Sequence, residues 1–138
     1  MTSTTLMSDT ALLDAAREVA HRAYVPYSHF PVGAALIDGE GHLVTGCNVE
    51  NAAYGETICA ERNAITTMVA QYGAQRISAI AVIGLKAAPC WPCGACRQVL
   101  REFQCERVIV EGPDGEPLSL PFEKILPYSF GPEALDEE

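Results

Sequence analysis

The chain has 138 residues, enough to close one hydrophobic core, and we predict a single domain over residues 1–138. Hydrophobic residues make up 49% of it and charged residues 20%, a balance that excludes a disordered chain. The net charge is −9, and Lys86 and Lys124 are its two lysines. Nucleic-acid binding needs clustered basic residues, so this charge favours a small neutral substrate over DNA or RNA.

The sequence also predicts where the protein works. Its apolar runs are far shorter than the roughly 20 residues that span a bilayer, and its first residues lack the features of a signal peptide. We therefore expect a cytoplasmic protein with no membrane partner. Six cysteines are present, but a reducing cytosol disfavours disulfides. The close spacing of Cys90, Cys93 and Cys96 instead indicates metal binding or reactivity.

Hydrophobic periodicity and turn residues predict the elements in chain order. Apolar residues from Leu12 to Ala23 recur at helical spacing, which predicts a helix over 10–24 ended by Pro26. The later predicted elements are a strand over 31–37, a turn over 38–41, a strand over 42–47, a helix over 59–72 capped by Gly73, a strand over 77–85, a helix over 92–103 with Pro92 in its first turn, a strand over 107–111, a turn over 113–115 and a helix over 122–126. Loose tails are expected at 1–8 and 133–138. A hairpin followed by alternating helices and strands predicts an α/β fold, a mixed sheet with helices on both sides.

Three cysteines open two of these helices. Cys93 and Cys96 form a C-x-x-C pair at one predicted helix start, and Cys59 begins another helix. Helix N-termini stabilise thiolates, and zinc takes thiolate sulfur readily. Three protein ligands plus one water are typical of a catalytic zinc site, and no histidine lies at ligand spacing from the cluster. The sequence therefore predicts one Zn²⁺ on Cys59, Cys93 and Cys96, with a position open for water.

Two charged residues follow Cys59 closely. Glu61 is placed to accept a proton from water at the metal without itself binding the metal. Together with the sequence 92–96, Pro-Cys-Gly-Ala-Cys, it fits the two-part signature of zinc deaminases. Arg62 is predicted to donate to the cysteine sulfurs and to restore the Lewis acidity that three thiolates lower. The alternative for Arg62 is an ordinary surface arginine.

Other interpretations of the cysteines stay open at this point. A C-x-x-C pair can be redox-active or structural, and residues 90–93 resemble a thioredoxin-like pair. Cysteines 90, 93 and 96 also follow part of an iron–sulfur spacing, although the fourth cysteine is missing. Both interpretations leave Cys59 and Glu61 unused. Cys47 and Cys105 are expected to be small buried apolar residues, and Cys90 either the same or a neighbour of the zinc.

Beyond these motifs, the chain resembles the small, homotetrameric, zinc-dependent cytidine deaminases. The resemblance covers roughly residues 10–135. It rests on four blocks of sequence, at 26–36, 46–54, 92–103 and 127–132. It implies a three-layer α/β/α fold with a mixed, roughly five-stranded sheet, one Zn²⁺ per chain, and a homotetramer whose sites are completed by neighbouring subunits.

The resemblance also implies the residues that bind the substrate. Asn48 and Glu50 would bind the ribose 3′-hydroxyl and Phe30 would pack on the base. The alternation of Asn48, Glu50 and Ala52 along an extended segment would place them on one face. Without the resemblance, the first two indicate a polar strand end and Phe30 indicates core packing. The other implied contacts with the base come from the backbone of Ala60, the backbone of Ala52 and Tyr54 in a neighbouring subunit, and Phe130 across an interface.

The implied reaction is hydrolytic deamination of free cytidine and 2′-deoxycytidine by zinc-activated hydroxide at C4, with Glu61 moving the protons. The products would be uridine or 2′-deoxyuridine and ammonia, as in pyrimidine salvage. Blasticidin S deaminase shares the architecture and zinc motifs and is the nearest alternative, although the blocks at 26–36 and 46–54 favour the cytidine enzymes. Deaminases acting on nucleic acids usually have His as the first ligand and basic channels. A non-enzymatic zinc module would leave Glu61 unexplained, and His29 has no assigned role.

Overall fold

Five strands form one mixed sheet within residues 7–136, the part of the chain that the computed structural model describes. The strands are β1 (Val32–Asp38), β2 (Leu43–Cys47), β3 (Ile77–Gly84), β4 (Arg107–Glu111) and β5 (Pro117–Pro121). Their order across the sheet is β2-β1-β3-β4-β5, with β3 and β4 parallel and the other neighbouring pairs antiparallel. The predicted α/β fold with a mixed sheet is confirmed.

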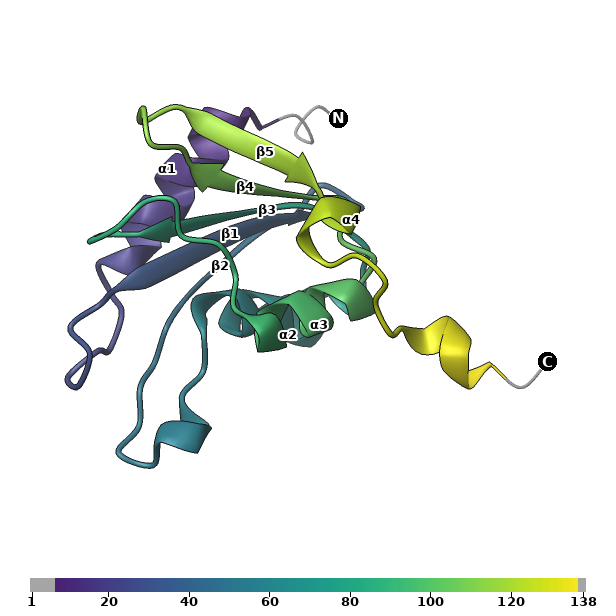
Figure 1. The fold of residues 1–138 in the computed structure, drawn as a ribbon, viewed down its shortest axis with the longest axis horizontal. Helices are drawn as coiled ribbons and strands as arrows, with labels where there is room; N and C mark the ends of the chain where they lie inside the picture. Colours follow the sequence, from purple (N-terminus) through teal and green to yellow (C-terminus); the bar gives the residue numbers. More distant parts are fainter. Residues whose placement is uncertain (1–6, 137–138) are drawn as a thin grey trace.

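Helices cover both faces of this sheet (Figure 1). Helix α1 (Asp9–Ala20) lies on one face, and α2 (Ala60–Tyr72) and α3 (Gly94–Glu102) lie on the other. The short helix α4 (Phe122–Ile125) follows β5 and packs on the same side as α2. Strand β3 is buried between the layers: Val82 joins the core under α2, and Ile83 joins the core under α1. This explains why its sequence is a continuous apolar run.

Gly46 in β2 sets the position of α2. A Cβ atom at Gly46 would lie 2.5 Å from the backbone nitrogen of Ala64 and 2.8 Å from the carbonyl oxygen of Ala60. Both atoms belong to helix backbone, which cannot move aside cheaply. The Asn63 side chain then donates to the carbonyl of Cys47 over 2.9 Å. The first turn of α2 is therefore fixed against the end of β2, and this turn carries Glu61.

The first predicted helix is too long in the sequence analysis. Helix α1 ends at Ala20 instead of residue 24. Tyr24 instead pairs with the segment after β2, donating to the carbonyl of Asn48 and accepting from the N–H of Glu50. Pro26 disfavours helical backbone at Val25, so the chain leaves the helix before that point. The early exit brings the block at 26–36 beside the segment after β2.

Three further differences from the prediction are an additional strand, a later start of one helix and a short helix near the C-terminus. Strand β5 was not predicted; it lies at the edge of the sheet, where its terminal prolines Pro117 and Pro121 are tolerated. Pro92 precedes the N-cap residue Cys93 of α3 instead of lying in its first turn. A 3₁₀ helix, Pro132–Leu135, occupies the first half of the expected acidic tail. The expectations for residues 1–6 and 137–138 lie outside the described residues. In the range 7–136 no helix has the length and apolarity to cross a membrane.

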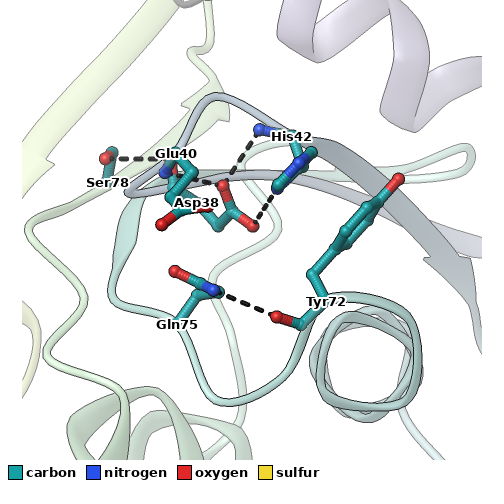
Figure 2. Close-up of polar contacts among 6 residues, drawn as sticks. All are labelled: Asp38, Glu40, His42, Tyr72, Gln75 and Ser78. Carbon is teal, nitrogen blue, oxygen red and sulfur yellow. Dashed lines mark hydrogen bonds and ion pairs between the residues drawn. The ribbon is translucent and has the colours of Figure 1, made fainter.

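A buried carboxylate holds the β1–β2 hairpin to the end of α2 (Figure 2). Asp38 is 1% exposed and accepts hydrogen bonds from the backbone N–H groups of Glu40 and His42, both at 2.9 Å. The His42 ring Nδ1 also lies 2.9 Å from Asp38, and it must donate because an ionised carboxylate only accepts. The same ring stacks on Tyr72, with centroids 3.7 Å apart and planes 6° apart. Gly73 caps the helix after Tyr72, as predicted, with φ of 84°.

Asp38→Asn is expected to destabilise the protein at pH 7 by about 1–3 kcal/mol, the usual effect of removing a buried charged partner. Burial alone would raise the pKa of Asp38, but the hydrogen bonds from His42 and Glu40 outweigh it and leave this pKa below its ordinary value. The stabilisation is therefore present above the unfolded pKa of about 3.9 and is lost as pH falls through the folded value. Thermal melts of both proteins between pH 7 and pH 3 should show the difference in Tm shrinking below about pH 5.

The matched control is Asp14→Asn, which removes the same charge from the exposed side of α1. Its melting temperature should follow that of the wild type at every pH. A constant difference between wild type and Asp38→Asn down to pH 3 would show that the Asp38 charge does not contribute to stability.

Candidate active site

The N-termini of α2 and α3 bring three cysteines together. Cys59 is the N-cap of α2, Cys93 is the N-cap of α3, and Cys96 lies in the first turn of α3. Their three Sγ atoms all lie within 4.8 Å of one another, and the Cys59 and Cys93 sulfurs are 3.7 Å apart. Tetrahedral zinc with Zn–S bonds of about 2.3 Å places its sulfur ligands about 3.8 Å apart. The cluster is therefore positioned to bind one zinc ion.

The cluster already stabilises a thiolate. The pKa of Cys59 falls to about 5, because the Cys96 thiol donates to its sulfur and Arg62 and Cys93 add to the effect, against burial. The pKa of Cys96 is raised, because it is the donor to that sulfur and is buried. Both cysteines sit at helix N-termini, where unpaired N–H groups favour negative charge. Deprotonated sulfur is the form that binds zinc.

Glu61 lies in the first turn of α2, inside the protein. The residue is 4% exposed. The pKa of its carboxyl is raised to about 7, mainly by burial and also by the Cys59 thiolate, whereas the Cys96 thiol and Arg62 act in the opposite direction. A carboxyl group in this setting can both take up and release a proton near neutral pH. Glu61 therefore has the position and the proton affinity of a general acid–base beside the cysteines.

Arg62 contacts the cysteines from the next position of the helix. Its Nη2 donates to Cys59 Sγ over 3.3 Å, as the sequence predicted. Its Nε is buried and has no acceptor among the described residues. Three thiolates around one zinc ion carry a net charge of −1, which this guanidinium would offset. The donor set, its spacing and the neighbouring cation all fit zinc.

The comparisons with known proteins agree with this geometry. Residues 6–111 match the family model described as the zinc-binding region of cytidine and deoxycytidylate deaminases. The chain belongs to this family. The resemblance to the zinc-dependent cytidine deaminases and the zinc cofactor are thereby confirmed, and the redox and iron–sulfur interpretations of the cysteines are set aside.

Members of the cytidine deaminase family resemble the chain over nearly its whole length. It is 42% identical over 127 residues to the cytidine deaminase of Sporosarcina psychrophila, covering 90% of this chain and 92% of that one. The crystal structure of the Burkholderia pseudomallei cytidine deaminase has 41% sequence identity and a TM-score of 0.82, covering 90% and 100% of the two chains. The Mycobacterium tuberculosis cytidine deaminase structure has 37% identity and a TM-score of 0.80, covering 91% and 99%. The chain is thus a zinc-dependent hydrolase of this family.

In this cytidine deaminase fold, the segment after β2 runs beside the metal cluster. Val49 exchanges two backbone hydrogen bonds of 2.9 Å with Ile58, the residue directly before Cys59. Asn48 uses its side chain on the neighbouring loop, donating to the carbonyl of Phe30 over 3.0 Å and accepting from the N–H of Val32 over 2.9 Å. The structure thus places two of the predicted substrate residues, Asn48 and Phe30, side by side.

Ala52 and Tyr54 lie on a segment that leaves the body of this deaminase between β2 and α2 (Figure 1). Tyr54 is 76% exposed, and its ring meets Tyr27 edge-on with centroids 6.0 Å apart. The contacts of the described residues do not bring either one to the cysteines of its own chain. A cavity of about 300 Å³ lies at the base of the segment, lined by Tyr27, Ser28, Glu50, Asn51, Tyr54 and Thr57.

Helix α3 of this deaminase holds the C-terminal block in place. Gln98 donates to the carbonyl of Phe130 over 2.9 Å, and Arg101 donates to the Ser129 hydroxyl over 2.8 Å. Arg97, which was not singled out from the sequence, donates to the carbonyls of Pro92 and Ile125 over 2.7 and 2.8 Å. The Phe130 side chain is 59% exposed and is not packed in the core of its own chain.

Three other residues lie outside the predicted site: two cysteines with no assigned catalytic role, and one serine that was not recognised from the sequence. Cys105 is buried, as expected, and burial raises its pKa to about 12. Cys90 is half-buried beside the core under α2, and burial raises its pKa to about 11. Ser28, which was not singled out from the sequence, contacts Glu50 and Phe30. Its signal in the sequence is a hydroxyl residue two positions before Phe30, a spacing typical of a local turn.

Proposed function

We propose that this chain hydrolyses free cytidine and 2′-deoxycytidine to uridine and 2′-deoxyuridine, releasing ammonia, as a step of pyrimidine salvage. The observation that carries the proposal is the buried carboxyl of Glu61 beside a cluster of three cysteines. Three protein ligands leave a fourth tetrahedral position for water, which is the pattern of a catalytic zinc site. The relatives named cytidine deaminase supply the substrate class.

Zinc bound by these cysteines supplies a Lewis acid that makes water nucleophilic at neutral pH. Glu61 accepts a proton from the attacking water and delivers it to N3 of the cytosine ring, so that C4 becomes electrophilic enough to take the oxygen. Glu61 then carries the second proton of that water to the amino nitrogen on C4, which leaves as ammonia. One water is consumed and the base ends as uracil. Arg62 steadies the cysteine sulfurs through its contact with Cys59.

The nucleoside is proposed to lie along the segment after β2. Glu50 and Asn48 would bind the 3′-hydroxyl of the sugar, and Phe30 would pack on the base. Support comes from the backbone pairing of Val49 with Ile58, which sets this segment beside Cys59. The remaining base contacts are proposed for the backbone of Ala60, the backbone of Ala52 and Tyr54 of a neighbouring subunit, and Phe130 across an interface.

A second copy of this chain is the proposed partner, in a homotetramer of single-domain chains. Tyr54, Phe130 and Leu135 are 76%, 59% and 71% exposed, and all three lie on segments that project from the layers of the fold (Figure 1). Near α2, a hollow of about 490 Å³ is lined by Val49, Ile58, Arg62, Asn63, Thr66 and Val99. Exposed aromatic and apolar groups of this kind favour association. We further propose a cytoplasmic location, because thiols that bind zinc must stay reduced.

The test is to incubate the purified, zinc-loaded protein with cytidine and with 2′-deoxycytidine and to follow the ultraviolet absorbance of the base. We expect the cytosine spectrum to disappear with release of one ammonia per nucleoside, and a sedimentation mass four times the 14.8 kDa of the chain. A zinc-loaded protein that leaves both nucleosides unchanged would contradict the substrate assignment. Blasticidin S would then be the next substrate to test.

A further inference from the structure

Ser28 connects two residues that the proposed function assigns to the nucleoside. Its backbone N–H donates to Oε1 of Glu50 over 3.1 Å, and its hydroxyl contacts Oε2 of the same carboxylate. The same hydroxyl lies 3.0 Å from the backbone nitrogen of Phe30. One side chain therefore joins the carboxylate proposed for the sugar to the aromatic residue proposed for the base.

The direction of these hydrogen bonds follows from their chemistry. An ionised carboxylate can only accept, so the Ser28 O–H donates to Glu50 and the Ser28 oxygen accepts from the Phe30 N–H. The bond from Ser28 is the main reason that the pKa of Glu50 lies below its ordinary value, so Glu50 is ionised at neutral pH. Consecutive bonds with one direction polarise and strengthen one another. Glu50 and Phe30 are thus oriented together.

Hydrogen bonds from the described residues leave the carboxylate of Glu50 one acceptor position. A carboxylate offers about four such positions. Oε1 accepts from the backbone N–H groups of Tyr27 (3.0 Å) and Ser28, and Oε2 accepts from the Ser28 hydroxyl. The remaining position is on Oε2, the oxygen that the Ser28 hydroxyl orients. Glu50 is exposed and lines the cavity at the base of the projecting segment, so a ligand hydroxyl can reach its carboxylate.

The loop around Ser28 is fixed from both sides. His29 has a φ of 57°, in the left-handed region that residues other than glycine rarely adopt, and its N–H donates to the carbonyl of Val25 over 3.0 Å. Asn48 holds the other side through the carbonyl of Phe30 and the N–H of Val32. Because neighbouring residues over-determine this conformation, the Ser28 hydroxyl has a fixed position.

We propose that Ser28 is a positioning residue for recognition of the sugar: its hydroxyl turns the free acceptor of Glu50 toward the 3′-hydroxyl of a nucleoside. The inference rests on the proposed function. No hydrogen bond joins Ser28 to Glu61 or to the zinc-binding cysteines within residues 7–136. Ser28 therefore acts on the binding of nucleosides that carry the 3′-hydroxyl and leaves the chemical step unchanged.

The experiment compares cytidine with 3′-deoxycytidine, which lacks the hydroxyl that Glu50 is proposed to bind. In Ser28→Ala, KM for cytidine should rise about tenfold, the usual effect of losing one hydrogen bond to a charged group, with kcat within about twofold of the wild type. KM for 3′-deoxycytidine should stay within about twofold of the wild type. Ser28→Thr keeps a hydroxyl and should restore the cytidine KM. Ser119→Ala, in β5, is the matched control and should change neither substrate's KM.

A double variant separates loss of the Ser28–Glu50 contact from a general loss of stability in Ser28→Ala, because a loss of stability would also lower activity when Glu50 is already replaced. In a Glu50→Gln background, adding Ser28→Ala should change the cytidine KM by less than about twofold, because the two residues act through one contact. Equal increases in KM for both substrates, an effect on kcat alone, or a Ser28→Thr variant that behaves like Ser28→Ala would overturn the role of Ser28. A wild type inactive on cytidine would overturn the proposed function, and this inference with it.

Discussion

Replacing Glu61 by Gln is expected to lower kcat/KM for cytidine by at least ~10²–10⁴-fold, the typical contribution of a positioned general acid–base. Glutamine has nearly the shape of glutamate and fits the buried position, where Glu61 is 4% exposed. Its amide, however, cannot take up and release a proton. Because Glu61 is not one of the three sulfur ligands, the variant should bind as much zinc as the wild type.

The measurement is the initial rate of loss of the cytosine absorbance, together with the zinc content of each protein. Glu18→Gln is the matched control, because it makes the same chemical change on α1, on the opposite face of the sheet from α2. This control should turn over cytidine at the wild-type rate. Near-normal turnover in zinc-loaded Glu61→Gln would show that another group moves the protons.

The regular elements could be predicted because each one carries its own pattern. Strand β4 has the predicted bounds residue for residue, Arg107–Glu111, and β3 differs by one residue at its end. Strand β5 was missed because prolines bound its short sequence, Pro-Leu-Ser-Leu-Pro. The strand is also only partly buried. Such a segment becomes a strand only because β4 offers it a free edge, and a pairing partner is not visible in the strand's own sequence.

The metal cluster could also be predicted, because its chemistry is local. Cys59 and Cys93 cap helices that the sequence already indicates, and Glu61 follows within one turn. The region proposed to bind the sugar is different, since Ser28 and Glu50 are 22 positions apart and meet only because Tyr24 pairs with Val49. That pairing depends on where α1 ends, and the predicted end lies four residues after the observed one. The long-range contact could therefore not be inferred, although the short-range contact from Ser28 to Phe30 could have been.

Cys96→Ser is expected to abolish zinc binding and, with it, cytidine turnover. Serine has nearly the volume of cysteine, so the buried position in α3, 0% exposed in the wild type, stays filled. A serine hydroxyl keeps its proton at neutral pH, whereas zinc needs deprotonated sulfur. Zinc content should fall from about one per chain to near zero. At a thousandfold excess of free zinc over its Kd, the wild type gains about 4 kcal/mol of stability. Its Tm should then fall by roughly 10 °C when a chelator removes the metal.

Cys105→Ser separates loss of the metal from loss of a buried thiol. Cys105 is 6% exposed and packs in the core under α2, where its thiol faces the carbonyl of Arg107 at 3.5 Å. This variant makes the same atomic change in a comparable setting, so it should keep its zinc, its activity and the response of its Tm to chelator. In Cys96→Ser the chelator should leave the Tm unchanged, because no metal remains to be removed. Stoichiometric zinc in Cys96→Ser would show that the metal binds a different set of residues. The three-cysteine site with an open coordination position for water, which the proposed reaction needs, would then be wrong.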